Sequence, residues 1–126
     1  MALRCVIVDD SPDFLRSARA LLEQEGLRVV GVASTSEAAF QHLAELRPDV
    51  TLVDVDLGAI SGFELARRLT AAPDVDPGHL ILISVHAEDD LVELLEASPA
   101  IGFLGKSTLS GAAVEALVRA AGDAGR

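Results

Sequence analysis

The stretch CVIVDD, residues 5–10, joins a short run of apolar, mostly β-branched residues to a pair of acids. Similar runs lie at residues 29–33, 50–53, 80–83 and 101–104, and together they predict five strands. The runs at 5–8, 50–53 and 80–83 do not alternate between apolar and polar residues. This is typical of parallel strands that helices cover on both faces.

The segments between these runs carry apolar residues at helical spacing, so strand and helix alternate along the chain. Ser11 followed by Pro12 predicts the start of the first helix, and Gly26 predicts its end. Ser34 with Glu37 has capping-box spacing and predicts the start of the second helix. The expected fold class is α/β, a doubly wound five-stranded parallel sheet flanked by five helices.

Length and composition indicate one domain, because 126 residues are too few for two cores of ordinary size. We expect the domain to cover residues 1–121, followed by a loose tail at 122–126. The formal charge of -10 favours cations and basic partner surfaces over direct binding of nucleic acid or an acidic membrane. Without a membrane-spanning run or a signal-peptide pattern, a cytoplasmic location is expected. Cys5, the only cysteine, is expected to be a small buried hydrophobe.

Polar residues follow four of the five predicted strands, at the edge where parallel sheets place their ligand sites. Each has an ordinary explanation alone: a turn and helix cap for the paired acids, a loop acid, or a solvated lysine. Together, three carboxylates at one edge would repel one another unless a cation were bound there. The residues are Asp9 and Asp10 after the first strand, Asp54 after the third, Ser84 after the fourth and Lys106 after the fifth.

The ligand types favour a hard divalent cation, Mg²⁺ or Mn²⁺, because the gathered ligands are carboxylates. Zinc is disfavoured, since His42, His79 and His86 have no metal-ligand spacing. With a hard cation bound, Asp54 is suited to attack phosphorus and form an acyl phosphate. Lys106 would then neutralise charge on the transferred group, and the Ser84 hydroxyl would donate to another of its oxygens.

Four segments, CVIVDDSPD, VTLVDVDLGAISGFEL, LILISVHAEDD and IGFLGKS, resemble the successive motifs of the response-regulator receiver family of two-component signal transduction. The resemblance covers nearly the whole chain and implies the flavodoxin-like fold of receiver type. It implies that Asp54 is the phosphoacceptor. It also implies that Asp9, Asp10, Asp54 and the backbone carbonyl of Asp56 hold the metal, while Ser84 and Lys106 contact the phosphoryl group.

The same resemblance implies a switch and a set of partners. Ser84 moves toward the phosphoryl group and the ring of Phe103 turns inward, which changes the face made by the fourth helix, fifth strand and fifth helix. The implied partners are a sensor histidine kinase or phosphotransfer protein, and an output domain or partner at that face, with phosphorylation-dependent homodimerisation as an option. The chain is not expected to be an enzyme, beyond catalysing its own phosphorylation and dephosphorylation.

The chain departs from the family's pattern at three positions. Gly58 stands where proline is common, Ser107 rather than proline follows Lys106, and Val85 stands where a smaller residue is usual. Because no proline follows Lys106, the sequence does not determine the direction in which the lysine side chain points. Val85 either obstructs access to the phosphoryl group or packs under the fourth helix.

Two further positions are expected to tune the rate of dephosphorylation. Asp56 and His86 lie two residues beyond Asp54 and Ser84, respectively, where their side chains would border the attacking water. The sign of either effect is open, because an acid or a histidine can orient water or hinder it.

Three rival readings come from the same residues. Asp54-Val55-Asp56 after an apolar strand is also compatible with a haloacid-dehalogenase-like phosphatase, although the short chain and Gly58 argue against it. A flavodoxin-like carrier would need a phosphate cradle where the two acids at 9 and 10 stand. A pseudo-receiver that serves only for docking or dimerisation is the third.

Overall fold

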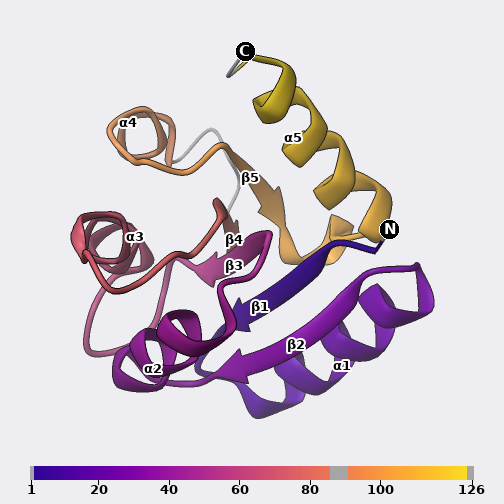
Figure 1. Ribbon diagram of the computed structural model, residues 1–126, viewed down its shortest axis with the longest axis horizontal. Helices are drawn as coiled ribbons and strands as arrows, with labels where there is room; N and C mark the ends of the chain where they lie inside the picture. The colour runs from indigo at the N-terminus through magenta and orange to yellow at the C-terminus, as the bar shows by residue number, and fades with distance from the viewer. Residues whose placement is uncertain (1, 86–90, 125–126) are drawn as a thin grey trace.

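Strands and helices alternate along the chain, as the apolar pattern predicts. The computed structural model describes residues 2–85 and 91–124 (Figure 1). The strands are β1 (Arg4–Val8), β2 (Arg28–Ala33), β3 (Val50–Asp54), β4 (His79–Ser84) and β5 (Gly102–Gly105). The helices are α1 (Pro12–Gln24), α2 (Ser36–Leu46), α3 (Gly62–Ala71), α4 (Val92–Glu96) and α5 (Gly111–Ala124), with a 3₁₀ turn, η2, at Lys106–Thr108.

The five strands form one parallel sheet in the order β2-β1-β3-β4-β5. Their bounds differ from the predicted runs by no more than one residue at either end. The order reverses between β1 and β3, and in doubly wound sheets ligands bind at this point, outside the carboxyl ends of the strands. The predicted fold class is therefore confirmed.

Helices cover both faces of the sheet (Figure 1). On one face, α2 and α3 pack against side chains such as Val53 and Leu82, and Leu95 of α4 joins them at the margin. On the other face, α1 and α5 pack against Leu52 and Ile81. The central strands β1, β3 and β4 are almost fully buried, which explains why their sequences lack alternation.

The first two helices begin with side-chain caps, one of them at an unexpected residue. Ser11 Oγ accepts the Phe14 N–H at 3.3 Å, as predicted for α1. The prediction of Ser34 for α2 is wrong, because Thr35 is the extended residue whose Oγ1 accepts the Ala38 N–H at 3.1 Å. Gly26 ends α1 with φ +99°, a conformation that glycine adopts without steric cost.

The C-terminal helix passes the domain boundary that we expected after residue 121. Helix α5 continues to Ala124, since the alanines around Gly122 favour helix strongly enough to carry it through one glycine. None of the helices in the described ranges is long and apolar enough to cross a membrane.

Candidate functional site

The turn after β1 places two acids at the point where the strand order of the sheet reverses, between β1 and β3, here called the switch point. Asp9 is fully buried: its N–H donates to the Ala33 carbonyl at 3.0 Å, and its Oδ1 accepts the Ser11 N–H at 2.8 Å. Asp10 is exposed. The hydrogen bond to Ser11 links the buried acid to the residue that caps α1, so the start of this helix fixes the acid's orientation.

Asp54 ends β3 beside Asp9 and is 4% exposed. Its Oδ1 accepts the Asp56 N–H at 3.2 Å, and its Oδ2 accepts a hydrogen bond from Lys106 Nζ at 3.3 Å. The start of α3 comes very close to this strand end, because a Cβ at Gly62 would lie 2.1 Å from the Asp54 carbonyl oxygen. No local pattern in the sequence distinguishes Gly62 from its neighbours, so this close approach could not be predicted.

Lys106 reaches the two buried acids from η2, directly after β5. Its Nζ lies 2.6 Å from Asp9 Oδ2 and 3.3 Å from Asp54 Oδ2, and also 4.4 Å from the centroid of the Phe14 ring. The peptide bonds of the described residues are all trans, so Ser107 follows Lys106 through a trans peptide. The lysine, whose aim the sequence left open, therefore points into the acid cluster.

Burial and charge shift the pKa values of this group. Burial is the main reason that the pKa of Asp54 is raised, and the charge of Asp9 adds to it, against the opposing effects of the Asp56 N–H and Lys106. For Lys106, burial acts to lower the pKa, but the two neighbouring carboxylates outweigh it, and the pKa is raised. The lysine stays charged at neutral pH, while the burial of Asp54 opposes its negative charge.

The three carboxylates fit a divalent cation. One oxygen each from Asp9, Asp10 and Asp54 lie within 4.8 Å of one another. Asp9 Oδ2 is buried and forms an ion pair with the Lys106 ammonium at 2.6 Å. Three carboxylate oxygens gathered this closely, from two buried acids and one exposed acid, suit a hard ion such as Mg²⁺.

The remaining predicted site residues lie around this cluster. Ser84 is fully buried at the end of β4, in register with Gly105 of β5. Val85 is 77% exposed, so the alternative that it packs under α4 is wrong. Asp56 is exposed, and His86 lies outside the described residues.

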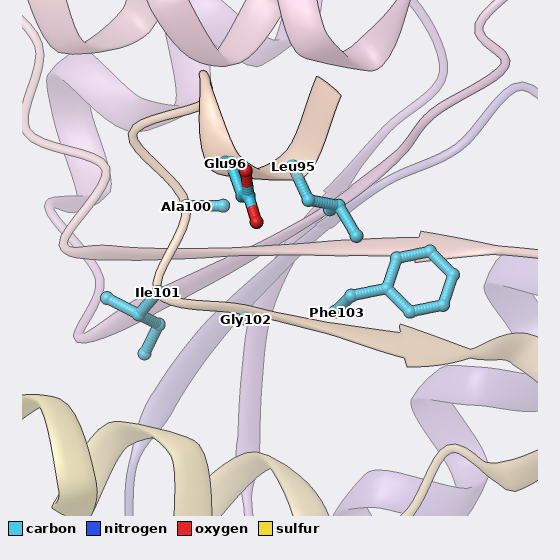
Figure 2. A pocket seen from close by; sticks show the side chains of 6 residues that line it. All are labelled: Leu95, Glu96, Ala100, Ile101, Gly102 and Phe103. Carbon is cyan, nitrogen blue, oxygen red and sulfur yellow. The ribbon is translucent and has the colours of Figure 1, made fainter. Parts of the chain in front are cut away.

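Phe103 lies on β5, on the side of the sheet that faces α4. Figure 2 shows its ring beside Leu95, which points down from α4 toward it. Both residues line a cavity of about 200 Å³ between α4 and β5, together with Ala100 and Gly102. The ring is only partly buried, and space remains beside it.

Cys5 takes no part in this site. It is fully buried in β1, and burial raises the pKa of its thiol to about 12. A thiol with so high a pKa forms almost no thiolate at neutral pH, which agrees with the expected role of a small hydrophobe.

Comparison with known sequences settles the family. The profile described as response regulator receiver domain matches residues 5–118. The chain belongs to the response-regulator receiver family. Response regulator GacA of Pseudomonas aeruginosa is 36% identical over 118 residues, which cover 91% of this chain and 52% of that protein. The receiver chain thus spans about half the length of this curated relative.

Solved structures give the same assignment. The signal receiver domain of the putative response regulator NarL from Mycobacterium tuberculosis has a TM-score of 0.75 and 28% identity, with 98% of this chain and 95% of that one covered. A response regulator of the LuxR family from Aurantimonas sp. has a TM-score of 0.79 at 25% identity, over 95% of this chain and 87% of that one. Membership of the receiver family leaves the haloacid-dehalogenase-like reading without support.

A different kind of relative shares part of the receiver. A protein-glutamate methylesterase/protein-glutamine glutaminase of Hahella chejuensis is 39% identical over 64 residues, which cover 51% of this chain and 18% of that protein. The match lies within the receiver of the present chain, so it says nothing of methylesterase activity here.

Proposed function

We propose that this receiver accepts a phosphoryl group on Asp54 from a sensor histidine kinase or phosphotransfer protein. One observation carries the proposal: a buried acid at the switch point lies beside a second buried acid, and both contact the same lysine. A solvated loop acid would have no need of such surroundings. Burial in a polar, charged pocket is the usual setting of a reactive carboxylate.

The transfer step exchanges one bond for another. An oxygen of the Asp54 carboxylate forms the new bond to phosphorus as the P–N bond of a phosphohistidine breaks. The electron pair of the broken bond stays on the imidazole nitrogen of the donor, and the product is an acyl phosphate on Asp54. Lys106, already 3.3 Å from Asp54 Oδ2, is close enough to neutralise charge on the transferred group.

The metal proposed for this reaction is Mg²⁺ or Mn²⁺, held by Asp9, Asp10, Asp54 and the backbone carbonyl of Asp56. Such an ion neutralises negative charge on phosphoryl oxygens and orients the group for in-line transfer. The chain contributes Asp9, which the Ser11 N–H orients, and Asp54, which the Asp56 N–H orients. Both ligands are therefore positioned before any ion binds.

Phosphorylation is proposed to be read out at the face made by α4, β5 and α5. The buried Ser84 hydroxyl would bond to the phosphoryl group, and Phe103 would move inward beside Leu95, where the cavity leaves room. An output domain or partner, or a second phosphorylated copy, would bind there. We place this cycle in the cytoplasm, with no direct contact to nucleic acid or membrane, and expect no enzymatic activity beyond the chain's own phosphorylation and dephosphorylation.

Three residues are proposed to set the rates of the cycle: Asp56, Val85 and His86. Val85 follows Ser84 directly and is exposed rather than packed, so its side chain is free to obstruct the mouth of the site. Asp56 is exposed two residues beyond the acceptor, where it would border an attacking water.

The acceptor is tested by mass spectrometry after incubation with acetyl phosphate and Mg²⁺. The wild type and an Asp74→Asn control, which removes an exposed acid from the loop before β4, should each gain one acid-stable, base-labile phosphoryl group. Asp54→Asn should gain none. An adduct that persists in Asp54→Asn would refute the assignment, and no adduct in the wild type with either a small donor or a kinase would favour the pseudo-receiver reading.

A further inference from the structure

Lys106 is the only lysine of the chain. Some contacts of its ammonium would change during the phosphorylation cycle, whereas one would not. Two of them are the Asp9 and Asp54 carboxylates. Under the proposed function, on which this inference rests, those oxygens are the ones needed by the metal and by the phosphoryl group. Neither acid can therefore be a fixed partner of the lysine throughout the cycle.

The third contact does not change its chemistry. The Lys106 ammonium lies 4.4 Å from the centroid of the Phe14 ring, within the range of a cation–π interaction. The lysine side chain is only 16% exposed, so little water competes for the ammonium. A desolvated cation over a ring is the case in which this interaction is strongest.

The position of the ring is tied to the acid cluster by a short chain of hydrogen bonds. The Phe14 N–H donates to Ser11 Oγ at 3.3 Å, and the Ser11 N–H donates to Asp9 Oδ1 at 2.8 Å. Phe14 thus belongs to the same capped turn that orients the buried acid. The Lys106 side chain has four rotatable bonds and starts from a 3₁₀ turn that contains no proline. Without the contact to Phe14, neither the side chain nor the turn would fix the position of the ammonium.

We propose that Phe14 is a positioning residue, which holds the Lys106 ammonium over the acceptor while Asp9 and Asp54 exchange partners. The ring does not touch the reacting atoms and acts only through the lysine. Removing its π-face should leave the fold intact and lower the occupancy of the productive lysine position. We expect the affinity for beryllofluoride, a phosphoryl mimic, to fall about tenfold at saturating Mg²⁺, which corresponds to about 1.4 kcal/mol.

The single lysine makes this directly observable. In protein labelled with ¹³C at the lysine ε-carbon, Lys106 gives the one lysine signal, and the protons over the Phe14 ring should be shielded by its ring current. Phe14→Leu should abolish the shielding, and Phe14→Tyr, which keeps a ring in place, should retain it. Phe40→Leu removes a partly buried ring packed elsewhere against the core, on α2, and should leave the signal unchanged.

The affinity measurement uses the same variants, with Phe14→Met as a second ring-free variant should Phe14→Leu unfold. The proposal requires weak beryllofluoride binding in the ring-free Phe14 variant and wild-type binding in Phe14→Tyr and Phe40→Leu. It is overturned if the ring-free variant binds within twofold of the wild type, if Phe14→Tyr is as weak as that variant, or if the shielding survives without the ring. Failure of the wild type itself to bind beryllofluoride would instead count against the proposed function, and the lysine signal would still report on the contact.

Discussion

The acceptor end of β3 and the face made by α4, β5 and α5, called here the outer face, differ in how tightly their side chains are packed. All five residues of β3 are buried, whereas all four residues of β5 are only partly buried. Asp54 has hydrogen-bond partners on both oxygens, but Phe103 lines a cavity, and no residue of the short helix α4 is buried. Two strands of one sheet thus have very different packing.

This difference suits a switch. A reactive carboxylate needs ligands fixed in position before reaction, which the buried central strands provide. A read-out surface needs two arrangements of similar free energy. Loosely packed regions adopt alternative arrangements more readily than tightly packed ones. A phosphoryl group contributes a few new contacts, and those can shift the outer face more readily than the centre of the sheet.

The contrast in packing predicts the largest difference in stability. Leu52→Ala, in the buried centre of β3, should lower the free energy of unfolding by about 3 kcal/mol, because it leaves a cavity. Leu94→Ala, at a position of α4 that is 51% exposed, should change it by less than about 0.5 kcal/mol. Urea denaturation of both variants measures this. Comparable losses would show that α4 is as firmly packed as β3.

The next prediction concerns Val85, the residue that directly follows the buried strand β4. If its methyl groups obstruct the in-line path, Val85→Ala should raise the rates of phosphorylation by acetyl phosphate and of dephosphorylation on the order of tenfold. Val92→Ala is the matched control, because Val92 is also exposed but lies on α4, away from the end of β4, and it should leave both rates unchanged. Unaltered rates in Val85→Ala would remove this residue from the mechanism.

The smallest predicted effect is a gain in stability at the acceptor. Burial raises the pKa of Asp54 above its ordinary value of 3.8, so stability is lost as pH rises above 3.8, and the full loss is reached above the folded-state pKa. Without divalent metal, Asp54→Asn should therefore be more stable than the wild type at neutral pH, by on the order of 1 kcal/mol for each unit by which folding raises the pKa of Asp54. The gain should shrink as pH falls through the folded-state pKa and vanish only well below 3.8, where Asp54 is protonated in both the folded and the unfolded state. Thermal unfolding across pH measures it, and a less stable Asp54→Asn would contradict the cause given for the shift.

The sequence predicted the strands well because the central ones are buried on both faces, and such runs are unmistakable. It also predicted that Asp9, Asp54 and Lys106 would meet, since parallel strands bring their carboxyl ends to one edge. The start of helix α2 was harder to predict, because Ser34 and Thr35 can both cap a helix. Only the path of the backbone decides which of them does.

What the sequence could not predict depends on distances between elements. The contact of Lys106 with Phe14 requires the relative placement of η2 and α1, which no local pattern encodes. The fit of Gly62 against the Asp54 carbonyl depends likewise on how closely α3 approaches β3. The exposure of Val85 could not be read from the sequence either, since a valine after a buried strand is as compatible with packing as with exposure.

The central claim, that the firmly held acceptor controls the loosely held outer face, is tested most directly by amide chemical shifts. Spectra of the wild type and of Asp54→Asn are recorded with Mg²⁺, before and after addition of beryllofluoride. The wild type should change at the acceptor and also around Leu95 and Phe103, while Asp54→Asn should not change at either place. A wild-type response confined to the acceptor turn and α1, or an equal response in Asp54→Asn, would contradict the account.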